Sequence, residues 1–293
     1  MNSKSLTLKR IIIFCIIAFL PLCIVTAILN SSYGEMIFVS EKATALAYVL
    51  GCIGMFMPAV ANILTRLITK EGFDNVYLEV NFKGNTKYYI ASVVVKIIEN
   101  IICVLLAWRI FFKDFNFTQM FPAQNFSQGI AVFLLQISVS IIVFFPAFGE
   151  EFGWRGYLGP KLTELMSKPA AIITGGIIWG LWHAPLTVSG HNFGIDYPFY
   201  PWLGIFLMCI MCTLINAFLT LLTEKTKSIY PASFCHMINN NLSFGVILSL
   251  FASENAINKL ADISSIHLFF LYLPILAVTG GISLWILLHD NDD

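Results

Sequence analysis

Three short stretches of the sequence carry polar side chains that could do chemistry inside long apolar runs. The first ends at Glu150, the second ends at His183, and the third pairs His236 with Asn240. An ionisable group carried into hydrocarbon is costly, so such groups normally face a bundle interior or a wet cavity. We therefore expect these four residues to converge in one site. Independent hydrogen bonds between helices are the alternative explanation.

These side chains suit the hydrolysis of an amide by water. A carboxylate beside an imidazole can take a proton from water, which leaves a hydroxide-like attacking group. A second imidazole and a side-chain amide can donate to the oxyanion that develops on a carbonyl. No serine or cysteine stands beside a histidine in these motifs as an obvious nucleophile, since Cys235 adjoins His236 but points to another helix face. Water is therefore the expected nucleophile.

Glu151 and Arg155 are expected to support the site without acting in it. Consecutive helical positions diverge by about 100°, so Glu151 should point elsewhere if Glu150 faces the site. Glu151 and Arg155 have the i, i+4 spacing of an ion pair within one helix. We expect Arg155 to neutralise Glu151 and to orient the helix.

The same residues leave a metal site open as an alternative. Glu150, His183 and His236 could bind a divalent ion such as zinc and leave one position free. The chain has no H-E-x-x-H helix, however, and an oxyanion-binding role already accounts for His236 and Asn240. Metal dependence is therefore left undecided by the residues.

The composition predicts that membrane helices position these residues. Hydrophobic residues make up 58% of the 293 and charged residues only 12%, which argues against a soluble protein. Basic and acidic residues balance, so no net field draws the chain to nucleic acid. Eight apolar runs are long enough to cross a bilayer. We expect an all-α polytopic membrane protein with about eight spans, near 11–29, 44–64, 89–112, 130–152, 170–187, 202–222, 230–251 and 267–288.

The charge distribution predicts the orientation of these spans and the extent of the domain. Twelve Lys and Arg residues fall in loops on one side and four on the other, and the basic side is normally cytoplasmic. Both termini should then be cytoplasmic. The loop over 65–87 mixes apolar and charged residues, which suits either an amphipathic surface segment or a plain solvated loop. We expect one transmembrane domain over 1–293, with the three motifs in a catalytic core over 130–251.

Other polar residues within the apolar runs are expected to have structural roles. Lys96 and Glu99 are three residues apart and can neutralise one another, and the alternative is that Glu99 and Asn100 line the cavity. The seven cysteines all lie in apolar segments, and we interpret Cys209 and Cys212 as packing residues although they form a C-x-x-C.

The three motifs together resemble those of the CPBP family, which comprises type II CAAX prenyl proteases and bacterial relatives linked to bacteriocin processing and self-immunity. The resemblance covers residues 130–251, where the usual Phe of the second motif is Trp179. The motifs are Glu150-Glu151-x-x-x-Arg155, Trp179-x-x-x-His183 and His236-x-x-x-Asn240.

The resemblance implies an eight-helix intramembrane endopeptidase. It implies that Glu150 and His183 activate water, while His236 and Asn240 stabilise the oxyanion. The family is often labelled a metalloprotease family, which keeps the zinc alternative open. The strings Gly-Trp-Arg-Gly-Tyr-Leu-Gly-Pro over 153–160 and Trp-Gly-Leu-Trp-His-Ala-Pro over 179–185 resemble the bacterial branch. This resemblance implies a bacterial plasma membrane and a peptide or membrane-protein substrate in place of a farnesylated one.

Two other classes of function fit the same residues. A non-enzymatic bacteriocin self-immunity or membrane scaffold protein could use this fold to bind a toxin or receptor. A proton-coupled carrier could use Glu150 and the histidines as a relay. A carrier should tolerate the loss of Asn240 better than a protease would.

Overall fold

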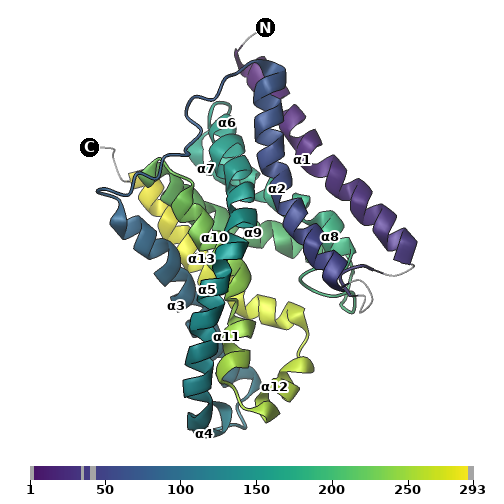
Figure 1. Ribbon diagram of the computed structural model, residues 1–293, viewed down its shortest axis with the longest axis vertical. Coiled ribbons are helices and arrows are strands. Elements are labelled where there is room, and N and C mark those ends of the chain that lie inside the picture. The colour runs from purple at the N-terminus through teal and green to yellow at the C-terminus, as the bar shows by residue number, and fades with distance from the viewer. Residues whose placement is uncertain (1–2, 34–35, 40–43, 290–293) are drawn as a thin grey trace.

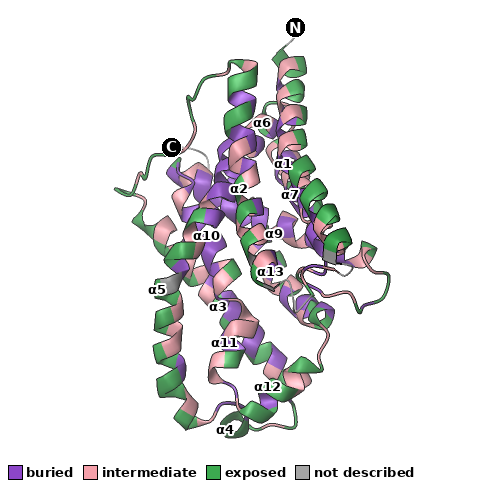
Figure 2. Ribbon diagram, turned by 45° about the vertical axis from the view of Figure 1, so that its right-hand side comes forward, coloured by how far each residue is buried: buried purple, intermediate pink, exposed green. Residues whose placement is uncertain are grey.

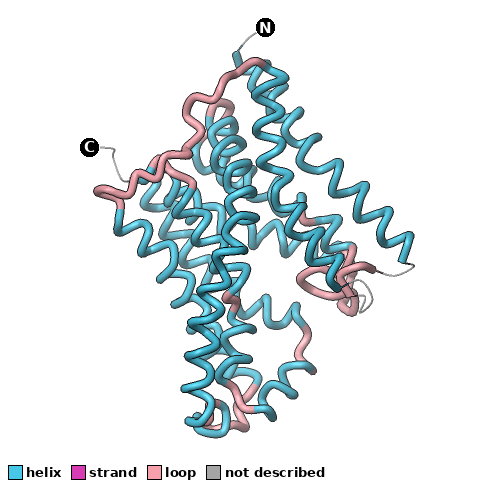
Figure 3. The backbone as a smooth tube through the Cα atoms, in the orientation of Figure 1, coloured by secondary structure: helices cyan, strands magenta, loops and turns pink. Residues whose placement is uncertain are grey.

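The computed structural model describes residues 3–33, 36–39 and 44–289, which form helices and loops and contain no strand (Figure 3). The long helices are α1 (Ser3–Tyr33), α2 (Thr44–Thr69), α3 (Thr86–Phe111), α5 (Ala123–Gly153), α7 (Lys168–Trp182), α9 (Trp202–Thr226) and α13 (Ser265–His289). The shorter helices are α4 (Phe117–Met120), α6 (Gly159–Thr163), α8 (Ala184–Val188), α10 (Tyr230–Asn241), α11 (Phe244–Phe251) and α12 (Glu254–Ala261). A π-helical turn over Trp154–Leu158 joins α5 to α6.

The helices confirm an all-α protein with several membrane-spanning segments. Within the described ranges, six helical segments are long and apolar enough to cross a membrane. Two further spans are bent pairs, one with a 44° bend inside α5 and one with a 51° bend between α10 and α11. Counting each pair once gives eight spans, the number expected from the apolar runs.

The packing gathers the buried residues around the C-terminal half of α5. Figure 1 shows α5 running through the middle of the molecule, with α1 and α2 on one side of it and α3 on the other. Buried positions concentrate where α2 and α10 lie along α5, and exposed positions line the outer face of α1 (Figure 2). Many of those exposed residues are large and apolar, such as Ile12, Ile16 and Leu20, as expected of a surface in contact with lipid.

Glycines let two pairs of helices approach closely beside the polar motifs. A Cβ added to Gly153 at the end of α5 would lie 2.3 Å from the Cβ of Pro58 in α2. A Cβ added to Gly180 in α7 would lie 2.4 Å from the Cα of Cys209 in α9. Small residues at such contacts are typical of helix packing in membranes. These contacts set the positions of the C-terminal ends of α5 and α7.

The loop between α2 and α3 contains no helix from Lys70 to Asn85. Its first part is held down by Glu71. That carboxylate lies 3.2 Å from Arg10 Nε and 2.6 Å from Lys161 Nζ, and it accepts a hydrogen bond from the Tyr157 hydroxyl. The loop is thereby tied to α1, to the π-helical turn and to α6.

The expected ion pair inside α3 is confirmed. Lys96 Nζ lies 2.7 Å from Glu99 Oε2, and both residues are buried. Tyr272 of α13 completes the group, because its hydroxyl accepts from Lys96 at 3.0 Å and donates to Glu99 at 3.1 Å. This group therefore joins α3 to α13.

Candidate active site

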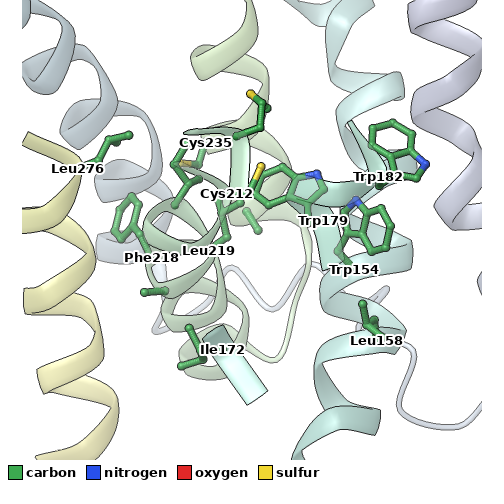
Figure 4. Packing of buried hydrophobic residues seen from close by; sticks show 14 of the residues in the cluster. Trp154, Leu158, Ile172, Trp179, Trp182, Cys212, Phe218, Leu219, Cys235 and Leu276 are labelled. Atoms are coloured by element: carbon green, nitrogen blue, oxygen red, sulfur yellow. The ribbon is translucent and has the colours of Figure 1, made fainter. Parts of the chain in front are cut away.

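Glu150 lies near the end of α5 with one carboxylate oxygen fixed by two tryptophans. Its Oε2 accepts a hydrogen bond of 2.8 Å from Trp179 Nε1 and one of 3.2 Å from Trp154 Nε1. Figure 4 shows these two indole rings close together, with Trp182 beside them. The residue is 2% exposed, so little but protein surrounds the carboxylate. Its Oε1 makes neither of these bonds and lies 4.0 Å from Nε2 of His236.

His236 on α10 contacts both neighbouring carboxylates. Its Nδ1 lies 2.7 Å from Glu151 Oε1, and that same oxygen accepts a hydrogen bond of 3.1 Å from Arg155 Nη1. A carboxylate paired with a guanidinium is an acceptor, so we assign the proton to Nδ1 of the imidazole. The Nε2 atom of His236 then faces Glu150.

This arrangement corrects the expectation that Glu151 points away from the site. The ion pair with Arg155 is present as expected, yet Glu151 also binds His236. The divergence of about 100° applies to the Cα–Cβ directions of adjacent helical residues. Two flexible glutamate side chains can still approach opposite edges of one imidazole ring packed beside them. Arg155 closes the group with its Cζ 4.2 Å from the centre of the Trp179 ring.

His183 is the C-cap residue of α7, and its hydrogen bond is to its own helix and not to the carboxylates. Its Nδ1 is 2.9 Å from the carbonyl oxygen of Trp179, and because a carbonyl only accepts, Nδ1 carries the proton. Cys212 Sγ lies 3.9 Å from the same nitrogen. No hydrogen bond joins the described side chains of His183 and Glu150. The imidazole nearer to Glu150 is therefore that of His236.

Asn240 follows His236 by one turn of α10 but differs from it in burial. His236 is 5% exposed, whereas Asn240 is an exposed residue. The Asn240 Oδ1 accepts a 3.3 Å hydrogen bond from Asn239. The structure thus joins Glu150, Glu151, Arg155 and His236 by direct contacts, while His183 and Asn240 make no hydrogen bond to these four residues.

The three candidate metal ligands do not fit a metal centre as they are arranged. No group of three His, Cys, Asp or Glu side chains among the described residues could hold a metal ion. Nδ1 of His183 is bound to its own helix, and Nδ1 of His236 is bound to Glu151, so only Nε2 of each ring is left as a possible ligand atom.

The sequence interpretation missed two donors and one contact. Trp154 stands at i+4 from Glu150 and Trp179 at i−4 from His183, which are spacings that place side chains on one helix face. Those spacings could have suggested that both indoles turn toward the site. No local signal could have suggested that His236 contacts Glu151, because that contact joins α5 to α10.

The part of the chain that carries this group is similar to known proteins. Residues 132–242 match the family described as Rce1-like, Type II CAAX prenyl endopeptidase Rce1-like. The chain is also 31% identical over 121 residues to a protein named CAAX prenyl protease 2 from Methanococcus maripaludis. That match covers 40% of this chain and 43% of the relative, so it spans less than half of the relative's length. Both matches make this segment, with its two carboxylates, two histidines and asparagine, similar to the Rce1-like type II CAAX prenyl endopeptidases, a family of peptidases.

Proposed function

We propose that the protein is an intramembrane endopeptidase that hydrolyses a peptide bond in a membrane-associated peptide or protein. One observation carries the proposal. Glu150 Oε1 and His236 Nε2 face each other across 4.0 Å inside a group of membrane helices. A gap of that length between two polar atoms suits a bridging water. The likeness of this segment to a peptidase family supports the same reading.

The proposed reaction begins when Glu150 takes a proton from that water. The water oxygen forms a bond to the carbonyl carbon of the substrate, and the carbonyl oxygen becomes an oxyanion. The protonated Glu150 then gives its proton to the leaving nitrogen as the C–N bond breaks. The two tryptophan donors hold Oε2, which leaves Oε1 as the oxygen that receives the proton. The products are one new carboxylic acid and one new amine, and Glu150 is returned to its ionised form.

The histidines and Asn240 are proposed to serve the water and the oxyanion. His183 has Nδ1 bound to a carbonyl, so its Nε2 is available to assist Glu150. His236 and Asn240 are proposed to donate to the oxyanion. To donate from Nε2, His236 must carry protons on both nitrogens, and the carboxylates on either side of the ring balance that charge. Glu151 and Arg155 hold the ring in place.

The setting of the enzyme is part of the proposal. We propose one transmembrane domain over 1–293 with a catalytic core over 130–251, in a bacterial plasma membrane with both termini cytoplasmic. We propose an unlipidated peptide or membrane protein as the substrate. The curated relative is named a prenyl protease, so the same peptide should be supplied with and without a prenyl group. Cleavage that requires the prenyl group would contradict the proposed substrate class.

The proposal is tested by comparing the peptides released from cell membranes. Membranes carrying the wild-type protein, the Glu150→Ala variant and a Glu254→Gln control are incubated and analysed by mass spectrometry. Glu254 is exposed at the start of α12, so its variant should behave as wild type. We expect cleavage products with the wild type and the Glu254→Gln control, and none of these products with the Glu150→Ala variant. Identical products from a folded Glu150→Ala variant would rule out the peptidase and favour a binding or scaffold protein.

A further inference from the structure

A cavity of about 190 Å³ lies beside the candidate active site and leads away from it. Its walls come from the π-helical turn, α6, the N-terminal part of α7 and the C-terminal part of α9. At one end it is lined by Trp154 and Arg155, whose side chains bond to Glu150 and Glu151. At the other end it is lined by Glu224 and Lys227, where α9 ends at the loops.

The walls of the cavity contain polar atoms that lack protein partners. Arg155 uses Nη1 on Glu151, while its Nε and Nη2 are buried and have no hydrogen-bond partner among the described residues. The Thr223 hydroxyl is also buried and has no hydrogen-bond partner among the described residues. Both residues are 3% exposed. A buried polar atom without a partner costs about 1–3 kcal/mol, so such atoms are normally paired with protein or with water.

The charges at the inner end of the cavity favour a neutral occupant. The Arg155 guanidinium is already balanced by Glu151, and Glu150 lies behind Trp154, which lines the cavity and bonds to it. The Glu224 carboxylate is balanced by Lys168 at 2.8 Å. An added anion would approach Glu150, and an added cation would approach Arg155. Water needs only about 10–15 Å³ of such space per molecule together with polar partners, so the cavity can hold several waters.

We infer that this cavity is a hydrated passage that delivers water from the loop side to Glu150. The inference rests on the proposed hydrolysis, which consumes one water in each turnover. The indole rings near Glu150 are bulky and buried, since Trp179 bonds to Glu150 and Trp182 packs against Trp154. The passage also opens on the face that carries most of the loop lysines and arginines, so it draws water from the cytoplasmic side in the proposed orientation.

Access to water can be tested without measuring catalysis. Thr220 and Thr223 line the cavity, whereas Leu222 between them is fully buried in the core. Single Thr220→Cys, Thr223→Cys and Leu222→Cys variants are treated, in lipid nanodiscs, with the neutral, water-soluble reagent 2-hydroxyethyl methanethiosulfonate. Mass spectrometry of the peptide that carries the new cysteine then reads the modification. We expect modification at 220 and 223 and none at 222. If the cysteines at positions 220 and 223 react only after denaturation, the proposed water passage is wrong.

Blocking the passage should slow turnover without weakening substrate binding. A Thr220→Phe variant fills the cavity, and Thr220→Ser is its control because it keeps the hydroxyl and the space. We expect kcat to fall by about tenfold with KM unchanged in the first variant only. Unchanged kcat in a folded Thr220→Phe protein, with Glu150→Gln inactive, would refute the passage and leave the hydrolysis standing. Modified cysteines in a protein that cleaves nothing would refute the hydrolysis alone.

Discussion

Nδ1 of His236 lies 2.7 Å from Oε1 of Glu151, so the second carboxylate of the first motif is bound to the imidazole of the third. The same Glu151 oxygen also accepts from Arg155. The side chain thus fixes which ring nitrogen carries the proton and which way Nε2 faces. A carboxylate that orients a histidine in this way has a large effect on rate when the histidine acts in catalysis.

We predict that Glu151→Gln lowers kcat by on the order of 100- to 10,000-fold, because an amide no longer fixes the proton on Nδ1 of His236. The pH dependence of kcat/KM should change as well, which a purely structural residue would not cause. Turnover across a pH series measures both effects. A matched Glu164→Gln variant, at an exposed ion pair beyond α6, should keep the wild-type profile. An unaltered pH profile in Glu151→Gln would contradict this role.

We predict that Arg155→Met destabilises the protein by about 3–5 kcal/mol, because Glu151 is fully buried and would keep only the His236 imidazole beside its charge. Thermal unfolding in detergent measures the loss. The double variant Arg155→Met with Glu151→Gln should recover much of the stability, since it removes both charges. A single variant that unfolds at the wild-type temperature would show that the pair contributes little.

The two tryptophan donors give a third prediction. Trp179→Phe keeps an aromatic ring beneath Arg155 but removes the 2.8 Å hydrogen bond to Glu150. A hydrogen bond to a charged group contributes about 1.5–3 kcal/mol, so kcat should fall by roughly 10- to 100-fold while the protein stays folded. Trp285→Phe on the exposed face of α13 is the control. Equal turnover in the two variants would mean that Trp179 does not orient Glu150.

Close approach between α5 and α2 gives a prediction about stability. An alanine at Gly153 would place its Cβ 2.3 Å from that of Pro58, so the helices must separate. We expect Gly153→Ala to cost about 1–3 kcal/mol despite the better helix propensity of alanine. Gly281→Ala in α13 meets nothing within 4 Å and should be neutral or stabilising. The unfolding temperatures of the two variants are compared with that of the wild type. A Gly153→Ala variant that unfolds at a higher temperature than the wild type would contradict the packing described for α5.

Substitutions at Asn240 distinguish an oxyanion-binding role from a metal-binding role. Removing one oxyanion donor costs on the order of 100- to 1,000-fold in turnover, so Asn240→Ala should lose rate with little change in KM. Asn240→Asp should lose at least as much, because a carboxylate repels the oxyanion. A metal site predicts the reverse for the aspartate, which is the better ligand. An active Asn240→Asp enzyme that a chelator inhibits would refute the oxyanion role.

The parts of the structure that depend on local spacing could be predicted from the sequence. The Arg155–Glu151 and Lys96–Glu99 pairs follow from positions one turn apart, and the helical spans follow from apolar runs. Contacts between helices could not be predicted in the same way. Whether Glu150 meets His183 or His236 depends on how α7 and α10 pack on α5. That packing is set by close contacts such as Gly153 with Pro58, which no single motif reveals.

The central claim is that Glu150 activates water for the hydrolysis of a peptide bond. It is tested most directly by the turnover of Glu150→Gln, which keeps the shape of the side chain and removes its basic oxygen. Wild type and variant are purified into nanodiscs, checked for equal unfolding temperature, and supplied with a peptide that the wild type cleaves. We predict a loss of at least about 1,000-fold in kcat with KM little changed. A folded Glu150→Gln protein that cleaves the peptide within a few-fold of the wild-type rate would contradict the claim.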